Sequence, residues 1–284
     1  MTPRCFVTLS AVVTALRLDL AFKLAAKFGY DGVEVMPTRL TSVHSVVRAQ
    51  KKYNTWATSV HGPFWTRKKV WNLLIHGDVS RKLEAIVFGC LLLGSFESNP
   101  ARKIARSLGI PIVLHPGVIF ELEHQRKLGL LKGLKVWVEN DDLVGFGVEV
   151  AKRAYDLLEK AGIEVRLVCD IEHLAKEFWN ECENFLDLLN RVIANTNGRR
   201  IAQFHICDLD PGAKDIKGGG HKRFGEGKLP IQEILSRVRA LRPEARVVVE
   251  VSKESMYKKP WLSREDRGWA EETARESIAT IRQI

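Results

Sequence analysis

Ionisable side chains recur along this chain at one kind of place, at or directly after the end of a short apolar run. The residues at these places are His61, His115, Glu139, Asp170, His205 and Glu250. A lone residue of this kind is more often a hydrogen-bonded core group or a capping acid. Several carboxylates that end buried segments together need a cation, because burying an unpaired carboxylate is very costly. The set therefore predicts a site of mixed carboxylate and imidazole ligands, which suits Mn, Mg, Zn or Co.

The elements that would carry these side chains are eight short runs rich in Val, Ile, Leu and Phe. The runs are Cys5–Leu9, Gly32–Met36, Ala57–His61, Ile112–His115, Val136–Glu139, Val165–Asp170, Ile201–Cys207 and Arg246–Val251. Between them lie amphipathic stretches with apolar residues at i, i+3, i+4 and i+7, as in Leu18–Ala25, Val148–Leu158 and Phe185–Val192. Strands that alternate with helices predict parallel βαβ units.

Eight such units predict an α/β fold, a single (β/α)8 TIM barrel that spans residues 1–284 as one domain. Length alone would favour about two domains. A doubly wound sheet is the alternative fold, but the first turn, Ser10-Ala11-Val12-Val13, lacks the glycines of its phosphate-binding motif. In a barrel the strand ends converge on one mouth, so Glu139, Asp170, His205 and Glu250 would share one metal centre.

The composition is that of an ordinary soluble globule and excludes several other classes. Hydrophobic residues make up 45% and charged residues 27%. No stretch approaches the roughly 20 uninterrupted apolar residues of a membrane span, and the first residues lack the pattern of a secretory signal. The five cysteines include no C-x-x-C pair, which disfavours a disulfide framework or a zinc ribbon. We therefore expect a reduced, cytoplasmic protein with no membrane partner.

The chain is strongly basic, since 44 Lys and Arg residues against 34 Asp and Glu residues give 44 − 34 = +10. Many of these bases fall in the loops that follow the predicted strands. They would suit a sugar phosphate or a DNA backbone, although a solvated cationic surface explains most of them. Lys222 and Arg223 directly follow His221, and we predict that these two contact the substrate.

The ordered set of motifs resembles the xylose isomerase-like TIM-barrel superfamily, which holds sugar isomerases, sugar epimerases and endonuclease IV (AP endonuclease family 2). The resemblance covers nearly the whole chain. It rests on Gly32-Val33-Glu34-Val35, His61-Gly-Pro-Phe64, Leu114-His115-Pro116-Gly117, Glu139-Asn140, Asp170-x-x-His173, His205, His221-Lys-Arg-Phe-Gly225-Glu226-Gly227 and Glu250.

The resemblance implies roles for these residues. In the isomerases and epimerases one divalent metal is held by residues matching Glu139, Asp170, His205 and Glu250, and the two glutamates also act as acid and base. In endonuclease IV the same quartet belongs to a three-zinc cluster whose further ligands match His61, His115, His173 and His221. The position of one more zinc ligand, an aspartate, is Gly219 here, and residues matching Phe64 and Trp65 enter the DNA in that enzyme.

Three functions stay open at this point. The first is a metal-dependent isomerase or epimerase of a sugar or sugar phosphate, in which the metal stabilises an enediolate while the glutamates move the proton. It is favoured by the complete quartet and by Gly219. The second is a zinc-dependent AP endonuclease that cuts DNA at abasic sites with two or three zinc ions, favoured by the four further histidines, the basic charge and Phe64-Trp65. The third, a non-catalytic barrel, is disfavoured by the intact ligand set.

Overall fold

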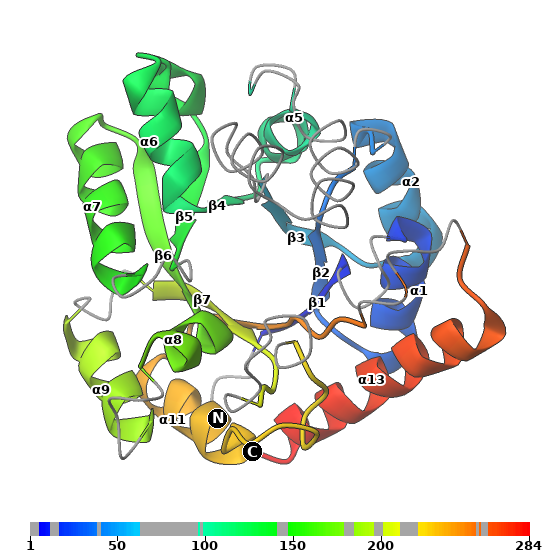
Figure 1. Ribbon diagram of the computed structural model, residues 1–284. Helices are drawn as coiled ribbons and strands as arrows, with labels where there is room; N and C mark the ends of the chain where they lie inside the picture. The colour runs from blue at the N-terminus through cyan, green and yellow to red at the C-terminus, as the bar shows by residue number, and fades with distance from the viewer. Residues whose placement is uncertain are drawn as a thin grey trace, which may run out of the picture.

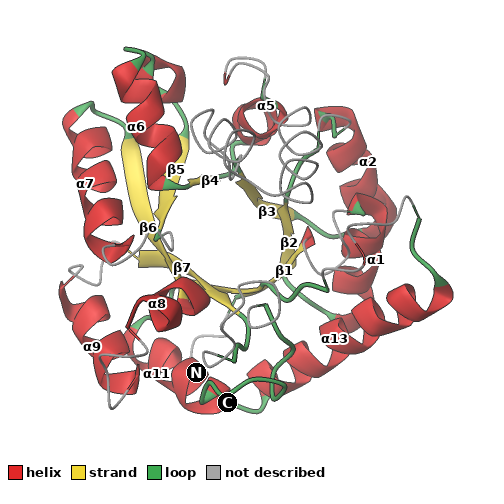
Figure 2. Ribbon diagram, in the orientation of Figure 1, coloured by secondary structure: helices red, strands yellow, loops and turns green. Residues whose placement is uncertain are grey.

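Eight parallel strands close into a barrel in the order of the chain, with helices around the outside (Figure 1). The computed structural model describes residues 6–11, 17–38, 41–62, 96, 99–140, 147–178, 185–195, 201–210, 221–253, 256 and 261–284. The barrel closes because β1 pairs in parallel with both β2 and β8. Figure 2 shows the resulting ring of strands inside a ring of helices. The predicted (β/α)8 barrel is confirmed, and the doubly wound sheet is excluded.

The strands follow the eight predicted apolar runs closely. They are β1 (Val7–Ser10), β2 (Gly32–Val35), β3 (Ala57–His61), β4 (Ile112–Leu114), β5 (Lys135–Glu139), β6 (Glu164–Asp170), β7 (Ile201–Ile206) and β8 (Arg246–Val249). Almost every position in them is buried, which is why they read as continuous apolar runs in the sequence.

The described helices lie between the strands in sequence. They are α1 (Leu18–Phe28), α2 (Val43–Tyr53), α5 (Pro100–Leu108), α6 (Pro116–His124), the 3-10 helix η3 (Leu128–Leu131), α7 (Gly147–Lys160), α8 (Ile171–Phe178), α9 (Phe185–Asn195), α11 (Ile231–Leu241) and α13 (Arg264–Arg282). Local signals set their ends: Ser42 and Ser263 form capping boxes, and Gly29 ends α1 in the left-handed conformation. No helix among the described residues is both long enough and apolar enough to cross a membrane.

The barrel interior contains a small apolar layer of its own, separate from the main core between strands and helices. This layer consists of Val113, Trp137, Val168 and Ala202. Side chains alternate between the two faces of a strand, so the residues two positions beyond Trp137 and Val168 face the same way. Those residues are Glu139 and Asp170, the last residues of β5 and β6. The strand pleat therefore presents both carboxylates at the C-terminal mouth of the barrel, above an apolar layer.

Candidate metal centre

Glu139, Asp170, His205 and Glu250 come together at the C-terminal mouth, as the strand ends predict. One ligand atom from each lies within 4.8 Å of the others, and all four residues are buried. His205 Nδ1 is 2.5 Å from Glu139 Oε1, 2.7 Å from Glu250 Oε2 and 3.9 Å from Asp170 Oδ2. Three carboxylates thus surround one imidazole nitrogen.

Hydrogen bonds at the ends of β5 and β6 hold Asp170 in this position. The Asn140 side chain accepts from the Asp170 backbone N–H at 2.7 Å and donates to the Asp170 carbonyl oxygen at 3.0 Å. The Asp170 Oδ1 accepts from the His173 backbone N–H at 2.9 Å and so caps the start of α8. Its other oxygen, Oδ2, remains directed toward His205.

Burial and neighbouring charges shift the pKa values of the quartet, and at Glu139 and His205 the two effects oppose each other. Burial alone would raise the pKa of the Glu139 carboxyl, but His205, His61 and His115 hold it well below its usual range. Burial, aided by the charges of Glu139 and Glu250, raises the pKa of Asp170 to about 6. Burial opposes protonation of His205, yet the surrounding glutamates raise its pKa well above the usual value. In the absence of a metal ion, the protonated His205 imidazole therefore supplies the positive charge that compensates the buried carboxylates.

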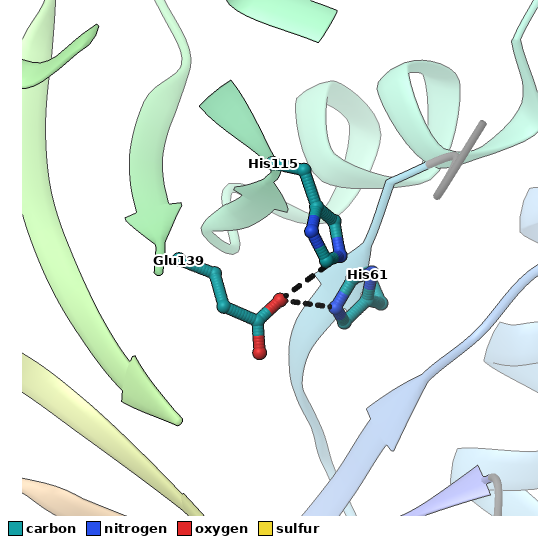
Figure 3. A group of neighbouring side chains, drawn as sticks. All are labelled: His61, His115 and Glu139. Carbon is teal, nitrogen blue, oxygen red and sulfur yellow. Dashed lines mark hydrogen bonds and ion pairs between the residues drawn. The ribbon is translucent and has the colours of Figure 1, made fainter. Parts of the chain in front are cut away.

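A second group of possible ligands adjoins the first and shares Glu139 with it (Figure 3). His61 Nε2 lies 2.8 Å and His115 Nε2 lies 3.2 Å from Glu139 Oε2. Burial opposes protonation of His61, but Glu139 outweighs it and the pKa rises to about 9. The two oxygens of Glu139 thus face different partners, Oε1 toward His205 and Oε2 toward His61 and His115. This geometry is that of a carboxylate able to bridge two neighbouring ions.

A buried polar network lies beneath His205. Glu34 is fully buried, and its Oε1 is 3.2 Å from His205 Nε2. Its Oε2 accepts hydrogen bonds from Ser59 Oγ at 2.8 Å and from Gln203 Nε2 at 2.7 Å. The sequence analysis gave Glu34 no role of its own, and it missed Ser59 and Gln203. The signal was present: Ser59 and Gln203 stand two residues before His61 and His205, on the same strand face.

His173 and His221 lie at the edge of the quartet. His173 Nε2 is 3.9 Å from Asp170 Oδ2, and its ring centroid is 6.3 Å from that of His115. His221 Nδ1 donates to the Glu250 carbonyl oxygen at 2.9 Å. Its backbone N–H donates to Glu172 Oε2 at 2.8 Å, so this buried carboxylate ties His221 to the first turn of α8.

Glu172 was missed by the sequence analysis, although it sits between Asp170 and His173. Its Oε2 also accepts a hydrogen bond from the Cys207 thiol at 2.9 Å, and its Oε1 pairs with Lys176. Burial and the Glu172 charge raise the pKa of Cys207 well above its usual value. Cys207 is therefore held as a buried, neutral thiol.

The loop that carries His221 is anchored by Asp208, another residue that the sequence analysis missed. The buried Asp208 carboxylate accepts four backbone hydrogen bonds, from Leu209 and Leu229 to Oδ1 and from Gly225 and Gly227 to Oδ2, at 2.8 to 3.0 Å. The turn at Gly225-Glu226-Gly227 thus wraps around this carboxylate. A Cβ at Gly227 would overlap Asp208 Oδ1, so only glycine fits there.

The four predicted substrate contacts have different outcomes. Phe64 and Trp65 lie outside the described residues. The backbone of Lys222 forms an isolated antiparallel β-bridge with that of Asp208, and Lys222 directly follows His221 at the mouth. The Arg223 guanidinium instead pairs with Glu272 and Glu276 of α13. These ion pairs hold the Arg223 guanidinium against α13, and its contact with substrate stays a prediction.

The quartet fits a divalent metal ion. Its donor set is three carboxylates and one imidazole, all buried, a combination suited to Mn, Mg, Co or Zn. His205 Nδ1 and Glu250 Oε2 approach closely, yet among the described residues neither atom has a hydrogen-bond partner of normal geometry. Buried polar atoms without such a partner are rare in folded proteins and indicate a position for an ion or a water.

Gly62 offers a test of how strand packing positions the second group. Its backbone N–H donates to the Val113 carbonyl oxygen at 2.7 Å, and a Cβ here would lie 2.8 Å from that oxygen and overlap Leu114 Cδ2. Gly62→Ala is expected to separate the ends of β3 and β4, to move His61 from Glu139 and to lower stability by about 1–3 kcal/mol. Metal stoichiometry and urea unfolding measure both effects.

Gly129→Ala is the matched control, because nothing lies within 4 Å of a Cβ at Gly129. Equal stability and equal metal content in the two variants would contradict the packing role of Gly62.

Comparisons with known proteins agree with this architecture. The model of the family described as Xylose isomerase-like TIM barrel matches residues 100–284, which is more than half of the chain. No curated protein sequence matches the chain.

Solved structures with a similar fold have names that state different activities. The IolI protein with a bound zinc atom superposes with a TM-score of 0.59 at 17% identity, over 98% of each chain. An L-ribulose 3-epimerase gives 0.57 at 13% identity, over 99% of this chain and 95% of its own. Endonuclease IV from Thermus thermophilus gives 0.54 at 15% identity, over 99% of this chain and 100% of its own.

At such identities the likeness concerns the fold, and the fold is common to structures named as an epimerase and as an endonuclease. The family assignment rests on the match to the family model, which includes the quartet and the strands β4 to β8 that present it. The chain belongs to the family of xylose isomerase-like TIM barrels.

Proposed function

We propose that the protein is a divalent-metal-dependent isomerase or epimerase acting on a sugar or sugar phosphate. The observation that carries this proposal is the approach of two buried glutamates, Glu139 from β5 and Glu250 after β8, to one imidazole nitrogen of His205. Moving a proton at the carbon next to a carbonyl requires one group to remove it and another to return it. Two carboxylates on well-separated strands beside one metal position supply that pair.

The residues of the centre have distinct tasks in this reaction. When bound, the metal supplies Lewis acidity toward the carbonyl and a neighbouring hydroxyl. Glu139 is suited to accept the proton, because its low pKa keeps it ionised. The His61 Nε2–H donates to Glu139 Oε2 and orients the carboxylate. Glu250, carrying a proton of its own, donates it to the other face of the same carbon, and Lys222 at the mouth attracts an anionic substrate.

Two structures of the same fold support the proposal by what their names state. One is an L-ribulose 3-epimerase, and the other, IolI, contains a bound zinc atom. A sugar-sized substrate also agrees with the small, buried donor set, in which all four ligands are almost inaccessible to solvent.

The second candidate is a zinc-dependent AP endonuclease, and one observation favours it. His61 and His115 converge on Oε2 of Glu139, next to the quartet, which is a suitable arrangement for a second ion. Hydrolysis of a phosphodiester gains from more than one metal, since the ions activate water and neutralise developing charge. Endonuclease IV from Thermus thermophilus has the same fold.

Solvent exchange tests the proposed reaction directly. In D2O the protein is expected to introduce deuterium next to the carbonyl of a ketose or ketose phosphate, as followed by NMR across a panel of sugars. Glu139→Gln is expected to slow this exchange by about 10²–10⁴-fold, because a neutral amide cannot take the proton. Glu149→Gln, on the exposed face of α7, serves as the control and should leave the rate unchanged.

Metal content and DNA cleavage separate the two candidates. One exchangeable Mn, Co or Mg per chain supports the isomerase, and two or three tightly bound zinc ions support the endonuclease. Incision of duplex DNA at an abasic site, lost in Glu250→Gln and accompanied by no exchange on any sugar, would overturn the proposal.

A further inference from the structure

A cavity opens at the opposite end of the barrel from the candidate metal centre. It encloses about 450 Å³ and is lined by residues at or before the N-terminal ends of seven strands, all but β7. The lining includes Phe6 ahead of β1, Trp56 ahead of β3, Lys135 on β5, Arg166 on β6 and Arg246 on β8. This volume falls in the range of small-molecule sites. The cavity is separated from the metal centre by the apolar layer that contains Trp137.

Three cationic side chains line this N-terminal cavity: Lys135, Arg166 and Arg246. Within the described part of the chain, none of the three forms an ion pair with a carboxylate. Burial lowers the pKa of Arg246, and repulsion from Arg166 adds to this effect, while the buried Glu34 opposes it. Like charges that face one cavity are a net cost to the folded state. A bound anion would remove that cost.

The cavity lining also contains acidic side chains, fewer than its cationic ones. Asp31 and Glu164 are the two carboxylates in the lining. Asp31 Oδ2 accepts a hydrogen bond from the Val7 backbone N–H at 2.8 Å. This bond joins the start of β1 to the residue just before β2. Glu164 is exposed and, among described residues, pairs with no cation. Three cationic side chains against these two carboxylates leave the lining with a net charge of 3 − 2 = +1, which attracts anions.

Arg246 is held rigidly in the cavity wall. Its Nη1 donates to the Thr58 carbonyl oxygen at 2.6 Å. Its Cζ lies 5.3 Å from the ring centroid of Phe6 and 4.9 Å from that of Trp137, so the guanidinium contacts two aromatic rings. A fixed guanidinium loses little side-chain freedom when an anion binds, which favours binding.

Exposed aromatic surface is concentrated at the same cavity. Four large apolar side chains are exposed among the described residues, and two of them, Trp56 and Phe6, line this cavity. Trp56 is 68% exposed. An exposed tryptophan beside cationic side chains can stack on a planar ring of a ligand while those side chains bind the ligand's phosphate or carboxylate.

We propose that the N-terminal cavity is a second ligand site, which binds a small anion carrying a planar aromatic ring, of the size of a nucleoside monophosphate. Arg166, Lys135 and Arg246 take the anionic group, and Trp56 stacks on the ring. No side chain is common to this site and to the metal-centre quartet.

Binding of 5′-AMP to the full-length protein tests this site, measured by calorimetry with inorganic phosphate and adenosine in parallel. AMP is expected to bind saturably and at least about tenfold more tightly than either fragment, because each fragment uses only half of the site. Arg166→Gln and Trp56→Ala are each expected to weaken AMP binding by about tenfold. Both side chains are exposed, so both variants should fold.

Arg237→Gln is the charge-matched control, because Arg237 is exposed on α11 and does not line the cavity. Thermal unfolding adds a second readout: Arg166→Gln should be no less stable than the parent without ligand, since it removes a like-charge repulsion. Three results would each overturn the inference: AMP that does not saturate, phosphate that matches AMP, or variants that bind AMP like the parent.

Discussion

His205→Ala is expected to remove tight metal binding and to destabilise the folded protein. His205 Nδ1 is the atom on which Glu139, Asp170 and Glu250 converge. Even partners that only orient a ligand contribute about 10–100-fold to metal affinity, so loss of the ligand itself should cost about a hundredfold or more. Without metal, the protonated imidazole is also the cation that compensates the buried carboxylates. Its removal leaves them uncompensated and should cost about 3–5 kcal/mol.

Metal content of the purified protein and urea unfolding with and without chelator measure the two effects. His124→Ala is the matched control, because His124 is exposed at the end of α6. Asp170→Ala should lose the metal as well. Full metal content in both His205→Ala and Asp170→Ala would show that the quartet is not the binding site.

Asp208→Ala is expected to have the largest effect on stability away from the metal centre. The buried carboxylate accepts four backbone N–H groups, from Leu209, Gly225, Gly227 and Leu229. Each is a hydrogen bond to a charged acceptor, and truncation leaves several of the donors without a partner. Because some of them would reach water, we expect a loss of about 3–5 kcal/mol rather than the full sum. The loop that bears His221 and Lys222 should lose its fixed position.

Urea unfolding measures this loss, and hydrogen exchange of the Gly225 and Gly227 amides reports the loop itself. Asp210→Ala is the matched control two residues further on, since Asp210 forms a surface ion pair with Lys228. That substitution should change stability by less than about 0.5 kcal/mol. If the Gly225 and Gly227 amides stay protected in Asp208→Ala, the carboxylate does not anchor the loop.

The fold was predictable because parallel strands buried on both faces leave continuous apolar runs. All eight runs became strands, with ends displaced by at most a few residues, and the ligand types at their ends reached one mouth. Strand alternation likewise places Cys169 in the outer core while its neighbour Asp170 faces the centre. These are local patterns that a single strand already contains.

The residues that the sequence could not assign depend on partners far along the chain. Glu34 acts through His205 and Gln203, about 170 positions away, and Asp208 acts through a loop whose glycines alone suggest only a turn. Arg223 shows the converse: its neighbour His221 suggested substrate, but α13 supplied carboxylates nearly 50 residues later. No local pattern encodes which of two distant partners a long side chain meets.

The two-sided contacts of Glu139 have a consequence for how the protein responds to its surroundings. One oxygen faces His205 and the other faces His61 and His115, so the carboxylate serves two adjacent binding positions at once. Where a second ion binds on the His61 and His115 side, it adds its positive charge to that of the ion at the quartet. The positive charge at the mouth, and with it the attraction for an anionic ligand, would then follow metal supply. Substrate affinity would thereby depend on metal concentration without a separate regulatory domain.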